Sequence, residues 1–170
     1  VELFEKGVPS SNKWPIRELE PSLSYPETAF GFFRYPQKYI GTGVREDRGN
    51  PLLLRAYARL RLPVGEHSLL IRGRSATRLF VDDQKVGELK FRSGFKDGHN
   101  PIRTDYLDLG PEMRWAAPGC KEEESTWLSD GKEHLFRFET MVGGGSKGRQ
   151  FRPELGETLV AVAAQGGAPY

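Results

Sequence analysis

Residues 65–89 read GEHSLLIRGRSATRLFVDDQKVGEL, and this stretch decides the fold class. Short apolar runs alternate in it with residues that favour turns, a pattern typical of strands joined by tight connections. The predicted strands cover residues 67–72, 77–81 and 86–91, with turns at 73–76 and 82–85. Strands this short and this closely spaced predict antiparallel pairing.

The preceding residues 52–62, LLLRAYARLRL, strengthen this prediction. From Leu54 to Leu62 every second side chain is apolar, and the side chains between them are arginine or tyrosine. A period of two is typical of a strand with one buried and one exposed face. Because a turn at residues 63–66 joins this strand to the next, we expect the strands to follow one another as an antiparallel meander.

The composition fits one all-β domain. A chain of 170 residues can bury a substantial core, and its 20 glycines and 12 prolines favour many short strands. Basic residues number 25 and acidic residues 23, a near balance that argues against a nucleic-acid partner. No apolar run approaches the roughly 18 residues of a membrane span, so we also expect no membrane insertion.

We expect a single β-sandwich domain over residues 1–164 and a linker over residues 165–170. Residues 1–45 are predicted to form an irregular wrapping segment, because five prolines interrupt it and aromatic side chains recur between them. Residues 110–127 are expected to be irregular as well. Since the sequence opens on Val1 without an initiator methionine, we expect it to be part of a longer protein.

The stretch that decides the fold also resembles the central hairpin of the domain first described in anthrax protective antigen. In that family a glycine precedes an alternating strand, and a loop then leads into an Arg-Leu-aromatic-apolar-Asp strand. Here that strand is residues 78–82, RLFVD, and the resemblance covers residues 54–89 well. It implies an antiparallel β-sandwich of the protective-antigen type with long irregular loops. Many members bind carbohydrate outside the cell, which implies a periplasmic or extracellular location.

A narrower resemblance concerns two other segments. Residues 48–56, RGNPLLLRA, and residues 151–158, FRPELGET, look like segments of large planctomycete proteins. Those proteins carry such a domain beside cytochrome c-like modules. The resemblance implies that other domains of a parent protein are partners of this one.

The sequence departs from the family at the calcium site. Carbohydrate-binding members that use calcium carry two adjacent aspartates in the loop before the Arg-Leu-aromatic strand. Here that loop is residues 72–76, RGRSA, which holds no carboxylate. We therefore expect no certain cofactor and do not carry the calcium-mediated sugar site over to this chain.

Two other groups of oxygen donors leave calcium open as an alternative. Asp82 and Asp83 are interpreted first as a hairpin turn, because aspartate tolerates left-handed backbone geometry. Asp97, Asn100 and Asp105 lie in the densest cluster of oxygen donors and are the candidate metal ligands, but their spacing is not that of an EF-hand. An Asx-type turn is the first interpretation there.

Arginine and aromatic side chains in predicted loops are the candidate ligand contacts. Arginine donates charge-assisted hydrogen bonds to anionic groups, and tryptophan presents a flat apolar face to a sugar ring. An alternative role for the tryptophans is to pin the irregular segment to the sandwich. The predicted contact residues are Arg72, Arg74, Asp97, His99, Trp115 and Trp127.

These features favour a non-catalytic carbohydrate-binding accessory domain of a larger extracytoplasmic protein, with an anionic polysaccharide as its ligand. The alternative is a structural or docking module that contacts neighbouring domains or proteins and takes no small ligand. An enzyme would need convergent acid, base or nucleophilic groups. The sequence offers no such constellation, so we expect no enzymatic activity.

Overall fold

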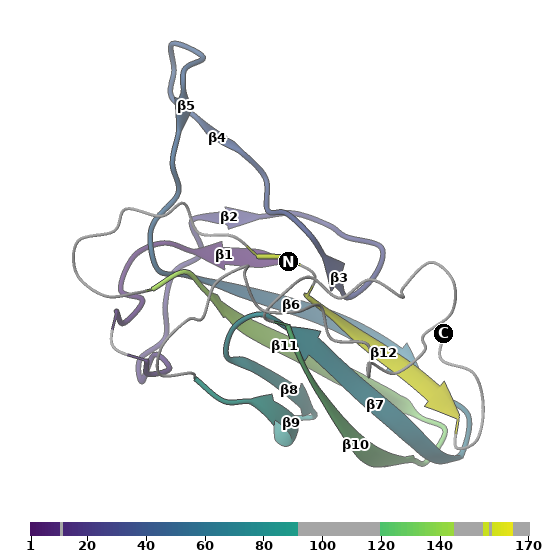
Figure 1. The fold of residues 1–170 in the computed structure, drawn as a ribbon. Helices are drawn as coiled ribbons and strands as arrows, with labels where there is room; N and C mark the ends of the chain where they lie inside the picture. The colour runs from purple at the N-terminus through teal and green to yellow at the C-terminus, as the bar shows by residue number, and fades with distance from the viewer. Residues whose placement is uncertain (11, 92–119, 145–154, 157, 165–170) are drawn as a thin grey trace.

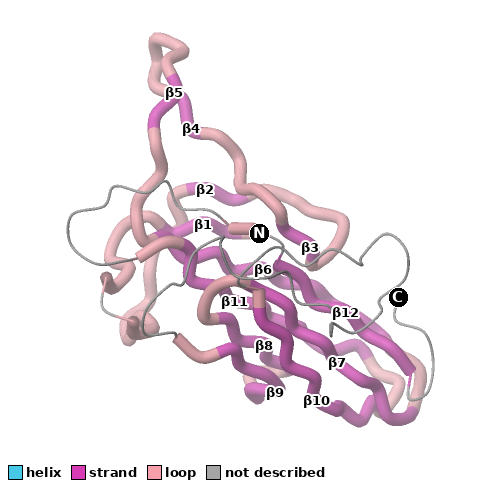
Figure 2. The backbone as a smooth tube through the Cα atoms, viewed as in Figure 1, coloured by secondary structure: helices cyan, strands magenta, loops and turns pink. Residues whose placement is uncertain are grey.

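The computed structural model describes residues 1–10, 12–91, 120–144, 155–156 and 158–164. Every regular element in these residues is a β-strand, and every strand pairing is antiparallel. Figure 1 shows two sheets lying one over the other, and Figure 2 shows the strands that make them in magenta. The predicted all-β antiparallel sandwich is confirmed.

The larger sheet has the strand order β2-β1-β6-β11-β8-β9 within the described residues. Long strands β6 and β11 pair along their whole length at its centre. The strands are β1 (Glu2–Phe4), β2 (Leu23–Ser24), β6 (Leu52–Arg61), β8 (Thr77–Val81), β9 (Gln84–Leu89) and β11 (Glu133–Val142).

The smaller sheet has the order β10-β7-β12-β3 in the same part of the chain. Its strands are β3 (Gly31–Phe32), β7 (Gly65–Gly73), β10 (Lys121–Ser129) and β12 (Thr158–Ala164). The two short strands β4 (Lys38–Tyr39) and β5 (Arg45–Glu46) pair only with each other among the described residues. They form a hairpin that stands away from both sheets, and we call residues 38–46 the arm (Figure 1).

The alternation predicted for β6 is confirmed. Leu54 and Ala56 are buried between the sheets, while Arg59 and Arg61 are exposed on the outer face. The core joins side chains of both sheets, among them Leu54 and Phe138 of the larger sheet and Leu69 and Ile71 of the smaller one. This two-sided core is why the strands need one apolar face each.

The predicted meander is wrong in its connections. Strands β6 and β7 follow each other in sequence but lie in different sheets, and so do β7 and β8. Among these strands only β8 and β9 are consecutive neighbours in one sheet, joined by Asp82 and Asp83 with φ of 46° and 65°. Periodicity fixes which face of a strand is buried, but it does not identify the partner strand.

That left-handed backbone at both central residues is the geometry of a two-residue hairpin turn. The turn interpretation of Asp82 and Asp83 is therefore confirmed. Within the described residues no group of histidine, cysteine, aspartate and glutamate side chains is placed to hold a metal ion.

The expected irregular segments are partly regular. In residues 1–45 the strand β1 pairs with β6 and β2, and β3 extends the smaller sheet, so this segment belongs to the sandwich as well as wrapping it. Trp14 packs with Phe4, Leu53 and Met141 on the outer face of the larger sheet. The segment that ends at residue 127 contains most of β10, whose charged sequence KEEESTWLS gives little sign of a strand because it pairs on only one side.

Candidate functional site

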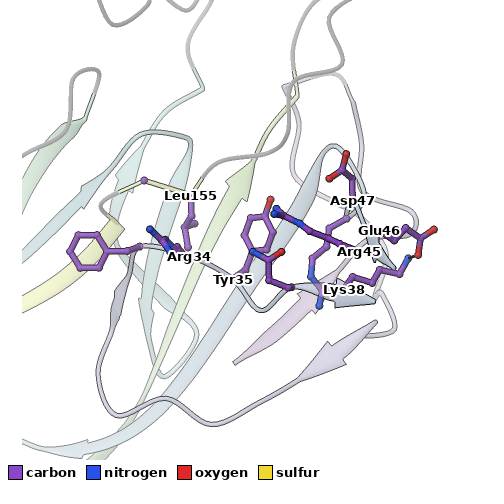
Figure 3. A pocket seen from close by; sticks show the side chains of 11 residues that line it. Arg34, Tyr35, Lys38, Arg45, Glu46, Asp47 and Leu155 are labelled. Carbon is purple, nitrogen blue, oxygen red and sulfur yellow. Dashed lines mark ion pairs between the residues drawn. The ribbon is translucent and has the colours of Figure 1, made fainter. Parts of the chain in front are cut away.

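An open cleft of about 460 Å³ lies where the arm joins the sandwich (Figure 3). It is lined by residues 33–35, 37–38, 45–48 and 155–156. Figure 3 shows Leu155 and Arg34 at the end away from the arm and Glu46 at the end formed by it. Four of the lining side chains are cationic and two are anionic: Arg34, Lys38, Arg45 and Arg48 against Glu46 and Asp47.

The base of the cleft is held by Arg48. Its Nε donates a hydrogen bond of 2.7 Å to the Pro36 carbonyl oxygen, and its Nη1 donates one of 3.0 Å to Glu5 Oε2. The other oxygen of Glu5 accepts a 2.7 Å hydrogen bond from the Gly49 backbone N–H. A Cβ atom at Gly49 would lie 3.0 Å from the Glu5 carbonyl oxygen, so a larger residue there would require the neighbouring backbone to shift by a few tenths of an ångström. These bonds therefore join the chain on both sides of the arm, at Pro36 and at Arg48 and Gly49, to Glu5, the residue that follows β1.

The walls of the cleft offer cations that are less constrained. Lys38 forms an exposed 2.9 Å ion pair with Glu46, and this hydrogen bond raises the pKa of Lys38. Arg34 and Arg45 are exposed, and no carboxylate in the described part of the chain pairs with either of them. The Tyr35 ring lies among these charges and is half buried. The cleft is therefore lined by guanidinium groups and two aromatic rings, the exposed Phe33 and the half-buried Tyr35, which also packs against the core.

The predicted contact Arg74 lies at the margin of this cleft. The backbone of Gly156, which lines the cleft, has φ of 65°, and a side chain there would lie 2.2 Å from Arg74 Cδ. Arg74 thus passes directly over Gly156, in the space that a larger residue would fill. The structure brings this predicted residue to the candidate site.

The structure places two other predicted contacts away from the cleft. The Arg72 side chain is fully buried and its Nε donates a 2.6 Å hydrogen bond to Glu122 Oε1. The Trp127 ring lies edge-on to His134 and Phe136, with centroids 4.9 and 5.5 Å apart. Both side chains hold strands together, so we assign neither a direct ligand contact.

The remaining predicted residues lie outside the described part of the chain. They are Asp97, His99, Asn100, Asp105 and Trp115. Conversely, Arg34, Tyr35 and Arg45 line the cleft and were not predicted from the sequence. One sequence feature could have identified them. Between Phe33 and Arg48, within the wrapping segment, arginine and lysine recur next to aromatic residues.

A second polar cluster lies at the β8–β9 turn. His134 Nδ1 bonds Asp82 Oδ2 at 2.5 Å, and its Nε2 bonds Asp130 Oδ1 at 2.9 Å. Asp82 also accepts a 2.9 Å hydrogen bond from the Leu135 backbone N–H. The hydrogen bonds to the two carboxylates raise the pKa of His134, and the hydrogen bond to His134 lowers the pKa of both Asp82 and Asp130.

We expect this cluster to make stability depend on pH. His134 stabilises the folded state as a cation, so its contribution is complete below its ordinary pKa of 6.5 and is lost as the pH rises through its raised pKa. The aspartates contribute above their ordinary pKa of 3.8 and lose that contribution as the pH falls. The difference in unfolding free energy between the wild type and His134→Gln should therefore be largest between pH 3.8 and pH 6.5. Urea denaturation across this pH range measures it.

A matched control is Glu133→Gln, which changes the neighbouring exposed residue on β11. This variant should show a constant difference from the wild type over the upper part of that range. A His134→Gln difference that does not shrink above pH 6.5 contradicts the assignment of a doubly bonded imidazolium.

Comparisons with known proteins give limited matches. No protein-family model matches the chain, and no curated protein matches it. A solved PA14 sugar-binding domain from an RTX adhesin is 16% identical with a TM-score of 0.44, over 72% of this chain and 51% of that one. A β-glucosidase from Kluyveromyces marxianus is 12% identical with a TM-score of 0.49, over 95% of this chain and 16% of that one.

The chain therefore spans about half the length of the adhesin domain and a smaller part of the β-glucosidase. The fold and the cleft define a β-sandwich domain with an open, basic cleft that contains an aromatic ring. The function proposed below rests on these residues of the chain itself.

Proposed function

We propose that the chain is a non-catalytic carbohydrate-binding accessory domain of a larger extracytoplasmic protein, and that its ligand is an anionic polysaccharide. The observation that carries the proposal is the cleft at the base of the arm. There Arg34 and Arg45 are exposed, the described residues provide no carboxylate partner for them, and the Tyr35 ring lies in the same hollow.

The chemistry of the cleft suits the carboxylate or sulfate groups of a charged sugar chain. A guanidinium group binds such groups through paired, charge-assisted hydrogen bonds. An aromatic ring stacks on the apolar face of a sugar ring. A volume of about 460 Å³ lies within the range of small-molecule sites, and an open cleft lets a polymer continue past the site.

The resemblance of residues 65–89 to the protective-antigen hairpin supports the same class of ligand. It also supports the proposed periplasmic or extracellular location. The family's calcium chemistry is not part of the proposal, because Arg72 and Arg74 occupy the loop where the aspartates would stand. In this chain the positive charge that meets the ligand comes from arginine.

Removing the two exposed arginines should abolish most of the affinity. We expect Arg34→Ala and Arg45→Ala each to weaken binding of an anionic polysaccharide by about tenfold or more, because each removes charge-assisted hydrogen bonds. Tyr35→Ala should weaken it as well, by removing the stacking surface. Affinity electrophoresis and calorimetric titration with a polyuronate, a sulfated polysaccharide and neutral dextran measure these effects.

Arg59→Ala is the matched control, because Arg59 is an exposed arginine on β6 that does not line the cleft and is paired with Glu133. It should leave binding unchanged. If no polysaccharide retards the wild-type protein, the proposal is wrong and a docking module without a small ligand is favoured. Equal losses in the cleft variants and in Arg59→Ala would show non-specific attraction between charges.

A further inference from the structure

The arm ends in a small ordered loop. The Ile40 backbone N–H donates a 3.0 Å hydrogen bond to the Val44 carbonyl oxygen, and the Gly43 N–H donates one of 2.8 Å to the Ile40 carbonyl oxygen. Gly43 has φ of 79°, a left-handed conformation that glycine adopts without strain. These bonds hold the loop in one shape at the far end of the projecting hairpin (Figure 1).

The side chains of this tip are apolar and exposed. Tyr39 is 61% exposed, Ile40 is 46% exposed and Val44 is 60% exposed. Residues 39–44, YIGTGV, carry no charge. Large apolar side chains gathered at the end of a projecting element are unusual on a soluble surface and indicate a contact with something apolar.

The tip presents these side chains on both faces of the hairpin. Tyr39 pairs with Arg45, and the Ile40–Val44 hydrogen bond makes those two residues the next pair. Because side chains alternate along a strand, Ile40 and Val44 share one face and Tyr39 lies on the other. An occupant that buries all three must therefore surround the tip rather than lie against one side of it.

Cations stand directly behind the uncharged tip. Lys38 and Arg45 flank residues 39–44 in sequence, and the strand register places Lys38 opposite Glu46. Glu46 compensates Lys38 through their ion pair, while Arg45 has no carboxylate partner among the described residues. Asp47 follows Glu46, so residues 38–47 carry no net charge, but Arg45 is the charged residue in the strand pair next to the tip. An apolar tip with a cation directly next to it is complementary to an apolar layer whose surface is anionic.

We propose that the tip of the arm inserts into the interfacial region of an anionic lipid bilayer. The apolar side chains enter the boundary between headgroups and acyl chains, Tyr39 lies at the level of the headgroups, and Arg45 contacts lipid phosphates. The sequence predicts no membrane insertion, and this proposal departs from that expectation only at the interface. No helix in the described residues is long and apolar enough to cross a membrane. Arg45 also lines the polysaccharide cleft, so the two proposals share this side chain, whereas Tyr39, Ile40 and Val44 belong to the lipid contact alone.

Vesicle co-sedimentation tests the proposal. The whole chain should sediment with vesicles of phosphatidylcholine and phosphatidylglycerol, and much less with phosphatidylcholine alone, since each basic residue gains about 1 kcal/mol, or roughly fivefold, near an anionic surface. Added salt should weaken the binding. The triple variant Tyr39→Ser/Ile40→Ser/Val44→Ser should bind the mixed vesicles at least about tenfold more weakly, because it removes the apolar area.

A matched control removes two exposed apolar side chains elsewhere. Val64→Ser/Leu128→Ser changes residues that are 77% and 73% exposed in and near other turns, and it should sediment like the wild type. A reporter variant, Tyr39→Trp, should show a blue shift of its emission when mixed vesicles are added. Far-ultraviolet circular dichroism and thermal unfolding of each variant confirm that the fold is retained.

Three outcomes overturn the proposal. The wild type fails to sediment with mixed vesicles, or the triple variant sediments as well as the wild type, or light scattering shows a dimer that the triple variant loses. The last result assigns the tip to contact with a second copy of the chain. Polysaccharide affinity measured on the same variants distinguishes this failure from failure of the proposed function, because the triple variant leaves Arg34, Tyr35 and Arg45 in place.

Discussion

Replacing Glu139 with alanine is expected to lower the free energy of unfolding by about 3–5 kcal/mol. The Glu139 side chain is completely buried on the outer face of the larger sheet. Its Oε1 accepts hydrogen bonds of 2.8 Å from Arg55 Nε and 3.1 Å from Arg137 Nη1. Its Oε2 accepts one of 3.1 Å from Arg78 Nε. One carboxylate thus joins arginines from β6, β8 and β11.

The large expected loss of stability follows from the arginine charges that alanine would leave without a carboxylate. The three guanidinium groups would face one another without the carboxylate between them, and removing one partner of a buried ion pair costs more than the pair itself contributes. They cannot turn freely to solvent, because the Arg78 guanidinium lies 3.9 Å from the Trp14 ring and that of Arg137 lies 4.1 Å from the Phe80 ring. The loss should also loosen Trp14 and the segment it anchors.

Two variants on the same strand make the measurement specific. Glu139→Gln keeps the volume and one acceptor oxygen, so its loss of stability should be intermediate. Glu133→Ala removes a half-exposed carboxylate that is 3.4 Å from Arg59, and this should cost less than about 1 kcal/mol. Urea denaturation gives all three values. A loss for Glu139→Ala no larger than that for Glu133→Ala would show that the arginines find equivalent partners without it.

Much of the sandwich could be predicted because its strands have one apolar face. The alternation in residues 52–62 identified the buried side of β6, and Asp82 and Asp83 identified the turn after β8. The allocation of β7 to the other sheet could not be predicted, because a turn of a few residues can reverse a strand within a sheet or carry it across to the facing one. The strand β10 could not be recognised from its sequence KEEESTWLS. It lies at the edge of its sheet, and edge strands often carry charges that discourage pairing with a further strand.

The candidate site was harder to predict than the fold. Arg72 and Arg74 are two residues apart in one predicted loop. Arg72 is buried and donates a hydrogen bond to Glu122, whereas Arg74 passes over Gly156 at the margin of the cleft. Spacing in sequence does not tell which arginine a neighbouring strand will bury. Arg34 and Arg45 were missed because the hairpin between them brings together residues from a segment without strong periodicity. Such a site is made by tertiary contacts rather than by a local motif.

Replacing Phe138 with alanine is expected to be the other large effect, with a loss of about 3–5 kcal/mol. The Phe138 ring is fully buried and stacks on two other rings, with centroids 6.1 Å from Phe30 and 5.7 Å from Phe32. Phe138 belongs to β11 of the larger sheet and Phe32 to β3 of the smaller one, so the stack joins the sheets. Alanine would leave a cavity where the sheets meet.

This cavity lies next to the element that positions the cleft. The chain runs from Phe32 in β3 directly into Phe33, Arg34 and Tyr35, which line the cleft. Phe138→Ala should therefore weaken polysaccharide binding as well as stability, although Phe138 is buried in the core. Phe138→Leu refills most of the cavity and should restore much of both. Thermal unfolding and affinity electrophoresis on the same preparations measure the two effects together.

Phe33→Ala is the control for stability alone, because Phe33 lines the cleft and its removal also takes away part of the ligand surface. The same side chain is removed, but Phe33 is 68% exposed, so the free energy of unfolding should change by less than about 0.5 kcal/mol. If Phe138→Ala destabilises the protein and leaves binding intact, the stack does not position the cleft and β3 is held by its pairing with β12. If Phe138→Leu restores stability and binding in parallel, the aromatic stack between the sheets sets the geometry of the cleft.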